Sequence, residues 1–189
     1  VGTKKGAVDY GFEGMNIAGY GAITQSAEFQ NYLKQAKLNY GAVKNPIYGN
    51  PSGKTLLAGE WDGTVESTPS YYLANYTIDM MNRFAAARKP FFIDCQFWGP
   101  HSPHLPSREY VGRHDRKAIK PWINFKDEMV GKPASVRRFV TGFYRALPDD
   151  WDGWREIIGL YYDYTSMIDD QVGRILNRLD ALGLADNTI

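Results

Sequence analysis

The sequence predicts an α/β fold, in which helices cover a sheet, and the 189 residues form a part of it. Two segments, 69–88 and 154–182, carry apolar residues at helical spacing. Between them, residues 91–97 form a short apolar run that is typical of a buried strand. The last six residues, LADNTI, lead into what should be a further strand, so the chain ends where a sheet edge would remain unpaired. We therefore expect a piece of a longer domain.

Composition limits the classes of partner. Hydrophobic residues make up 43% of the chain and aromatic residues 14%, which is enough to build a packed core. Lys and Arg number 22 against 21 Asp and Glu, so nothing points to nucleic acid. No run approaches 18 apolar residues, and no membrane span is expected. The single cysteine, Cys95, excludes an internal disulfide and lies in an apolar run that favours a buried thiol.

The first half of the chain is predicted to hold two helices. The first 25 residues are rich in Gly and aromatic residues and predict irregular structure. Ser26 is a candidate N-cap for a short helix, AEFQNYLKQA, and residues 40–68 predict an extended surface loop because Gly, Pro and Asn recur there. Thr68 followed by Pro69 predicts the start of a helix that ends near Arg88. Its expected apolar face comprises Tyr72, Leu73, Tyr76, Met80 and Phe84.

The second half is predicted to hold a strand, a mixed region and a long helix. Lys89-Pro90 ends the preceding helix, and Phe91, Ile93, Cys95 and Phe97 would share one face of a buried strand. Residues 111–150 predict loop with one or two short helices. The long helix should run from about Trp154 to Leu182, where Gly183 ends it. Its expected apolar stripe comprises Ile157, Tyr161, Tyr164, Ile168, Val172, Ile175, Leu179 and Leu182.

The stretch WGPHSPHLP directly after the predicted strand carries two of the three histidines, His101 and His104. Its three prolines remove backbone donors and restrict the chain, so neither helix nor strand is expected. We predict a rigid loop at the carboxyl end of a strand, which is where ligands bind in helix-covered sheets. The prolines also prevent the helical stacking that a zinc pair at this spacing would need. Two interpretations remain from the residues alone. Either the backbone or water forms hydrogen bonds with both histidines, or the histidines donate hydrogen bonds to an anion.

Three other patterns have structural interpretations. YGNPSGKT resembles a phosphate-binding loop but has three residues between its glycines where four are needed, so it predicts a polar turn. Asp169 and Asp170 are adjacent on a helix and cannot face each other, so we expect one to cap or to form a salt bridge and the other to meet solvent. RHDRKAIK predicts a solvated basic loop, and the tyrosines of the last helix predict core.

Three segments together resemble the middle of a sulfatase, in the alkaline-phosphatase-like superfamily. They are DYGFEGMNIAGYG, KPFFIDCQFWGPHSPHLPSREY and YYDYTSMIDDQVGRILNRLDALGLADNTI, and their order and spacing are also similar to those of sulfatases. The middle segment is the most specific of the three. The resemblance spans nearly the whole chain and implies that residues 1–189 form the central part of one sulfatase catalytic domain. The fold it implies is alkaline-phosphatase-like, with a mixed central sheet flanked by helices.

The resemblance implies hydrolysis of a small-molecule or carbohydrate sulfate ester. The nucleophile would be a formylglycine made from the Cys or Ser of a Cys/Ser-x-Pro-x-Arg motif, and calcium would be bound in the full-length enzyme. His101 matches the histidine that binds the sulfate group and stabilises charge there, so it is the candidate catalytic residue. His104 and Arg108 occupy positions where substrate contacts vary among relatives. No calcium ligand can be assigned to this chain, because those carboxylates belong to other segments.

The sequence also departs from the family pattern. In HLPSR, His104 occupies the place of the nucleophile, and a histidine cannot become formylglycine. Cys95 is followed by QFWG, which is not the motif, and neither Gly-Lys-Trp-His nor Ser-Asp-His-Gly is found. We therefore expect the 189 residues alone to be inactive. A phosphonate monoester or phosphodiester hydrolase and a non-catalytic sulfated-glycan-binding domain are the alternatives. Export to the periplasm or outside follows by analogy only, the cytoplasm is open, and so is the oligomeric state.

Overall fold

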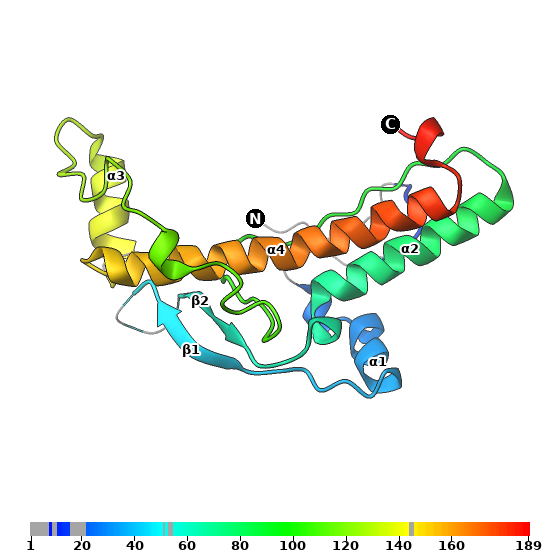
Figure 1. Cartoon of the computed structure of the whole chain (residues 1–189), viewed down its shortest axis with the longest axis horizontal. Coiled ribbons are helices and arrows are strands. Elements are labelled where there is room, and N and C mark those ends of the chain that lie inside the picture. Colours follow the sequence, from blue (N-terminus) through cyan, green and yellow to red (C-terminus); the bar gives the residue numbers. More distant parts are fainter. Residues whose placement is uncertain (1–7, 9–10, 16–21, 51, 53–54, 144–145) are drawn as a thin grey trace. The chain divides into compact units, whose positions relative to one another are not determined.

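The computed structural model describes residue 8 and residues 11–15, 22–50, 52, 55–143 and 146–189. The chain divides into two compact units, which are described separately here. The first contains Val1–Tyr40, Glu66–Trp98 and Gln171–Ile189, and the second contains Gly41–Val65 and Gly99–Asp170. The longest helix, α4 (Trp151–Ala181), contributes its first part to the second unit and its last part to the first (Figure 1).

Both helices predicted in the first half of the chain are present in the first unit, and so are their caps. Helix α1 spans Ala27–Gln35, and the Ser26 side chain accepts a hydrogen bond from the Phe29 amide at 3.2 Å. Helix α2 spans Pro69–Ala87, with Thr68 as its N-cap, and it ends at Arg88 in the left-handed conformation. Each cap satisfies an amide that has no partner within its helix, which explains why the sequence signals were reliable here. Short 3-10 turns, Ala22–Gln25 and Val65–Ser67, precede the two helices.

The core of the first unit lies between α1 and α2. Phe29, Leu33 and Tyr72 form its buried cluster, and the rings of Phe29 and Tyr72 meet edge to face with centroids 5.4 Å apart. The last part of α4 joins α2 through polar contacts, because Arg174 bonds to Asn75 and Arg178 Nε donates to Asn82 at 2.6 Å. The buried face of α2 is only partly the predicted one: it comprises Ser70, Tyr72, Ala74, Thr77, Met80 and Met81.

The second unit contains a two-stranded antiparallel sheet where an extended loop was predicted. Strand β1 spans Val43–Tyr48 and β2 spans Leu56–Trp61, with Val43 opposite Trp61 and Tyr48 opposite Leu56. The Gly49 amide donates to the Thr55 carbonyl at 2.8 Å, so YGNPSGKT connects the strands; Pro51, Gly53 and Lys54 lie outside the described residues. The loop prediction was wrong because the same Gly, Pro and Asn residues also serve a hairpin.

The predicted strand at residues 91–97 is also wrong for this structure, which assigns no strand there. The expected alternation is visible in the exposures, since Ile93, Cys95 and Phe97 are partly buried while Asp94 and Gln96 are exposed. Phe92 is nevertheless 75% exposed. A strand exists only when a neighbour accepts its hydrogen bonds, and in the described residues the sheet contains only β1 and β2. The mixed central sheet is therefore not seen in this part of the chain.

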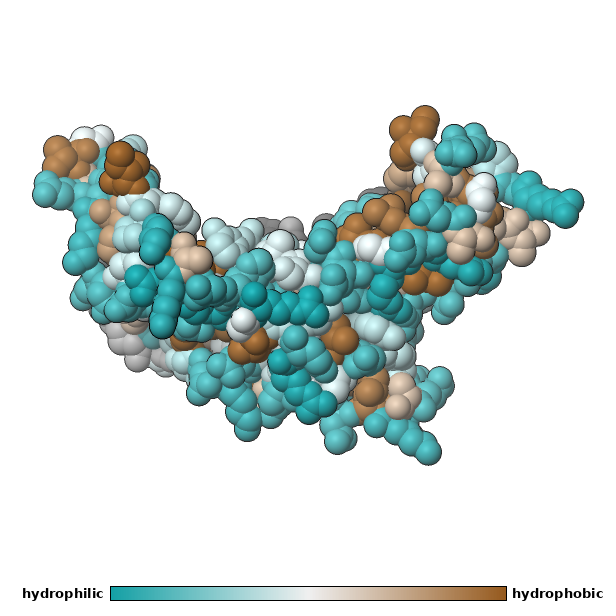
Figure 2. Space-filling model, viewed as in Figure 1, coloured by the Kyte–Doolittle hydropathy of each residue, from teal (hydrophilic) through white to brown (hydrophobic). Residues whose placement is uncertain are grey.

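Residues 111–150 hold short helices, as predicted: a 3-10 turn Arg116–Ala118, helix α3 (Ala134–Arg138) and a π-helical turn Phe139–Phe143. Apolar side chains are exposed in this region, and Figure 2 shows brown patches at the surface near α3. The exposed apolar side chains of residues 111–150 include Trp122, Ile123, Val130, Val136 and Phe139.

Helix α4 begins three residues before the predicted start, and Gly183 follows it at φ 67°. Its buried stripe is offset from the predicted one: Leu160, Asp163, Met167 and Gln171 are almost completely buried, while Tyr161 and Val172 are each 37% exposed. The tyrosines are therefore only partly core. The strand expected at the end of the chain is a 3-10 turn, Ala185–Asn187, and Ile189 is exposed. Among the described residues, no helix is long and apolar enough to cross a membrane.

Candidate functional site

The loop that carries His101 and His104 begins against α4, within the second unit. A Cβ added to Gly99 would overlap Ile168 and Tyr164 of that helix, so only glycine allows this approach. The Gly99-Pro100 and Ser102-Pro103 peptide bonds are both cis. Contact with α4 therefore fixes the start of the loop at Gly99.

The loop ends alongside β2. The His104 amide donates to the Leu57 carbonyl at 2.8 Å, the Gly59 amide donates to the His104 carbonyl at 3.1 Å, and the Trp61 amide donates to the Pro106 carbonyl at 2.9 Å. The hydrogen bonds form two isolated parallel bridges between the loop and β2. Pro106 and Ser107 are buried there. His101 lies in irregular structure, as predicted, but no strand precedes the loop. The prediction was wrong for His104, which lies on a short extended piece that pairs with β2.

His101 is exposed, and one of its ring nitrogens is committed. Nδ1 lies 2.7 Å from the Ser102 carbonyl oxygen, and because a carbonyl only accepts, Nδ1 must carry the proton. In the neutral ring Nε2 is then an acceptor. Only the imidazolium form can donate from Nε2, so donation to an anion at that atom requires the ring to be charged.

His104 is in a different environment. Its Nδ1 donates to the Pro100 carbonyl at 3.1 Å, and its ring meets Tyr161 edge to face with centroids 5.0 Å apart. Burial lowers the pKa of His104 below its ordinary value, the hydrogen bond to Pro100 opposes that shift, and the charge of His101 lowers the pKa further. His104 therefore favours the neutral form, whose Nε2 accepts. Its chemistry differs from that of His101 although the two residues share one loop.

Arg108 lies beyond the buried Pro106 and Ser107, with its side chain exposed. Its Nε is 3.7 Å from Glu109 Oε1, a distance typical of a weak surface pair. The pKa of Asp62 is lowered mainly by the hydrogen bond from the Ala42 amide, with smaller contributions from Lys44 and Arg108. The structure thus brings His101 and His104 together on one loop. It places the Arg108 guanidinium near the carboxylates of Glu109 and Asp62.

A buried carboxylate was missed by the sequence analysis. Asp163 of α4 is fully buried and accepts from the Gly112 amide at 2.8 Å, the His114 amide at 3.0 Å and Arg116 Nη2 at 2.7 Å. RHDRKAIK is therefore attached to α4 through Arg116, and the prediction of a solvated loop was wrong for that residue. The available signal was an aspartate three residues after Leu160 and four before Met167, both apolar positions at helical spacing.

Two further side chains hold the same segment. Tyr110 donates to Asp170 Oδ2 at 2.7 Å, and Arg113 Nη1 lies 3.1 Å from the same oxygen. Burial, followed by the bond to Asp170, raises the pKa of Tyr110 to about 12. Asp169 is exposed. The prediction that one of the two adjacent aspartates forms a salt bridge while the other meets solvent is confirmed.

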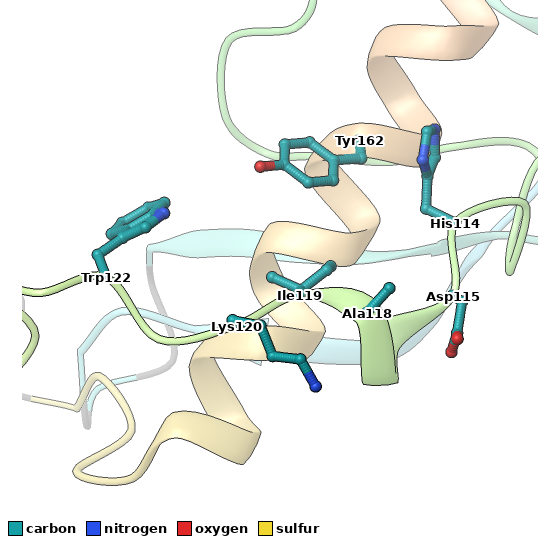
Figure 3. Close-up of a pocket in the computed structure, with 7 residues that line it drawn as sticks. All are labelled: His114, Asp115, Ala118, Ile119, Lys120, Trp122 and Tyr162. Carbon is teal, nitrogen blue, oxygen red and sulfur yellow. The ribbon is translucent and has the colours of Figure 1, made fainter.

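A cavity of about 320 Å³ lies in the second unit, and none of the three candidate site residues lines it. Figure 3 shows its lining side chains, which come from residues 114–122 and from α4. They are His114, Asp115, Ala118, Ile119, Lys120, Trp122 and Tyr162.

No group of three or more His, Cys, Asp or Glu side chains in the described part of the chain is arranged to hold a metal ion. Calcium prefers six to eight oxygen ligands, usually including several carboxylates. The described residues therefore do not fit a calcium site, and no chemical step is assigned to calcium here.

Comparison with known proteins identifies the family. The Sulfatase family model matches residues 15–189. The chain belongs to the sulfatase family. The match includes the histidine loop and all of α4, and the sulfatase domain implies an alkaline-phosphatase-like α/β fold, of which helices and a small two-stranded sheet are present here.

Individual sulfatases are similar along most of this chain. An arylsulfatase of Clostridium perfringens is 28% identical over 174 residues, covering 89% of this chain and 34% of that protein. An uncharacterized sulfatase, YidJ, of Escherichia coli is 24% identical over 171 residues, covering 90% and 30%. Iduronate 2-sulfatase of Mus musculus is 24% identical over 129 residues, covering 59% and 22%. The chain thus spans about a third or less of the length of these sulfatases.

Proposed function

We propose that this chain is the central part, residues 1–189, of a sulfatase catalytic domain that hydrolyses sulfate monoesters, and that His101 is its site residue within the chain. The observation that carries the proposal is an exposed imidazole held by the backbone of a loop that is fixed at both ends, in a chain of the sulfatase family. A fixed donor is what transition-state stabilisation requires, because it does not need to reorganise when charge develops.

In this proposal His101 acts as an imidazolium, donating from Nε2 to a sulfuryl oxygen. The Nδ1 proton is held by Ser102, so it keeps the ring in one orientation. A formylglycine of the whole enzyme would supply the attacking oxygen. As the bond from that oxygen to sulfur formed, the bond between sulfur and the ester oxygen would break, and the alcohol would leave with the proton given up by the attacking hydroxyl. Sulfate would then leave the nucleophile as its aldehyde re-formed. That nucleophile would lie in a segment outside these 189 residues, because none of them forms Cys/Ser-x-Pro-x-Arg.

His104 and Arg108 are proposed to contact the substrate in different ways. His104 favours the neutral form, so its Nε2 would accept from a substrate hydroxyl. Arg108 is exposed and weakly paired, so its guanidinium would donate to a polar or anionic group outside the reacting sulfate. Calcium, expected in the whole enzyme, would be held by residues of other segments.

The test uses an enzyme that contains this chain together with a Cys/Ser-x-Pro-x-Arg segment. His101→Ala should lower kcat for an aryl sulfate by about 100 to 1,000-fold, as expected for loss of one such donor. Lys126→Ala, an exposed residue elsewhere in the same unit, is the matched control and should leave kcat unchanged. A His101→Ala enzyme with normal kcat would overturn the assignment. The 189-residue chain alone should show neither turnover nor tight calcium binding.

The alternatives predict other results in the same assays. A phosphonate monoester or phosphodiester hydrolase would turn over an aryl phosphonate faster than the matching aryl sulfate. A non-catalytic sulfated-glycan-binding domain would bind a sulfated sugar with saturation and release no sulfate.

A further inference from the structure

We propose that His104 and Tyr161 are positioning residues, which together hold the imidazole ring of His101 in one orientation. Their effect on turnover rests on the proposed function, whereas their effect on the His101 ring does not. The role belongs to the Nδ1 side of the His104 ring and to the packing of that ring, so it leaves Nε2 of His104 available to a substrate.

The orientation of the His101 ring depends on the position of one loop carbonyl. The ring is exposed, and its Nδ1 donates to the Ser102 carbonyl at 2.7 Å. A bond to the carbonyl of the next residue orients the ring only as well as the loop holds that carbonyl, and surface loops are mobile unless they are tied down. The contacts that fix the loop between Pro100 and His104 therefore control the direction in which Nε2 of His101 points.

The His104 side chain closes this part of the loop. Its Nδ1 donates to the Pro100 carbonyl at 3.1 Å, so the bond spans the stretch that contains His101 and Ser102. The backbone of His104 is held at the same time, because both its amide and its carbonyl form hydrogen bonds with β2. A site residue keeps its geometry when such supporting contacts lock the residues around it.

One face of α4 holds both ends of the loop. Tyr161, Tyr164 and Ile168 lie at positions i, i+3 and i+7, which share one side of a helix. The Tyr161 ring meets the His104 ring edge to face, with centroids 5.0 Å apart. Gly99, at the start of the loop, lies against the other two side chains. An edge-to-face contact restricts the orientation of both rings, so Tyr161 acts through His104.

The first test follows the His101 ring by nitrogen NMR of the 189-residue chain, because the ring nitrogen shifts distinguish the two neutral tautomers. We expect neutral His101 to carry its proton on Nδ1. His104→Gln carries its amide near the place of Nε2 and loses the bond to Pro100, so part of the His101 population should move its proton to Nε2. His104→Asn carries its amide near the place of Nδ1, so it should keep the native tautomer.

The second test compares two neighbouring tyrosines of α4. Tyr161→Ala removes the ring that meets His104, so it should shift the His101 tautomer in the same direction as His104→Gln. Tyr162→Ala is the matched control and should leave the His101 ring unchanged. Tyr162 is equally exposed, at 37%, but its ring meets His114, with centroids 5.6 Å apart (Figure 3). The two His104 variants keep the test valid if loss of the Tyr161 ring unfolds the chain.

In the complete enzyme, a positioning role predicts a loss of kcat without a matching rise in KM, because the support is needed in the transition state. His104→Gln and Tyr161→Ala should each lower kcat for an aryl sulfate by about tenfold to 100-fold, as expected when a catalytic group is slightly displaced. Their KM should change by less than about twofold. His104→Asn should restore most of the kcat that His104→Gln loses.

Three results would overturn the proposal. The first is an equal effect of His104→Asn and His104→Gln on the His101 tautomer, and the second is an equal effect of Tyr161→Ala and Tyr162→Ala. The third is a raised KM with unchanged kcat in His104→Gln, which would make His104 a substrate contact alone. If the tautomer responds as expected but His101→Ala keeps a normal kcat, the positioning of the ring stands and only the proposed function fails.

Discussion

Residues 91–98 and residues 104–116 lie close together in the chain but differ in how their neighbours hold them. The first segment is apolar, yet Phe91 and Phe92 are exposed and no strand is assigned. The second is polar, yet it pairs with β2 and binds the buried Asp163 through two amides and a guanidinium. The difference teaches that apolar character by itself does not bury a segment. A segment becomes ordered when a neighbour satisfies its backbone and fills its surface.

The largest effect should come from Asp163→Ala. The change leaves Arg116 and two amides without their acceptor in a buried place, and loss of one partner from such a group costs about 3–5 kcal/mol. Urea unfolding of the chain measures it. Asp169→Ala, an exposed carboxylate on the same helix, should change the free energy of unfolding by less than about 0.5 kcal/mol. Equal effects of the two would show that residues 104–116 are not held by Asp163.

The next effect concerns the start of the histidine loop. Gly99→Ala should destabilise the chain by about 1–3 kcal/mol, because the added methyl overlaps Ile168 and Tyr164. Gly142→Ala meets nothing within 4 Å and is the control. If thermal unfolding gave both variants the same melting temperature, the loop would not be packed on α4 as described.

Ser107→Ala, in contrast, should stabilise the chain. Its hydroxyl is buried and finds no hydrogen-bond partner among the described residues, so Ser107→Ala should raise the free energy of unfolding by about 1 kcal/mol. The same urea titration measures it. If Ser107→Ala instead lowered the free energy of unfolding, the hydroxyl would have a hydrogen-bond partner. Residues 104–116 would then be held by one more polar contact.

A pH effect should distinguish the two loop histidines. The pKa of His104 is lowered in the folded chain, so the unfolded chain takes up its proton first as pH falls below about 6.5. Stability is then lost as pH falls toward the lowered pKa. His104→Gln should lose less stability over that interval, measured as melting temperature from pH 7 to pH 5. A parallel decline in both proteins would contradict burial of His104.

The smallest effect is expected in the apolar segment. Phe92→Ser should change stability by less than about 0.5 kcal/mol, because Phe92 is 75% exposed. Its only described ring neighbour is Phe12, with centroids 6.3 Å apart. If Phe92→Ser lowered the free energy of unfolding in urea by more than about 1 kcal/mol, residues 91–98 would be packed in solution. They would then not differ from residues 104–116 in this respect.

Local signals were sufficient for several features. Ser26 and Thr68 marked helix starts correctly because a cap depends on neighbours three residues away. Gly183 marked the end of α4 for a similar reason. The prolines around His101 correctly excluded regular structure there. The family could also be recognised, because FWGPHSP and the residues of α4 are specific.

What the sequence by itself determined is therefore short-range: capped helices, a proline-fixed loop, an amphipathic helix and family membership. Only the tertiary structure decided that residues 43–61 pair as a hairpin, that residues 91–97 do not form a strand here, and that Asp163 is buried with Arg116. It also decided that the two loop histidines differ, since Tyr161 packs against the ring of His104 while His101 is exposed. The physical reason is that strands, buried ion pairs and shifted pKa values require partners distant in sequence, whereas caps and proline restrictions do not.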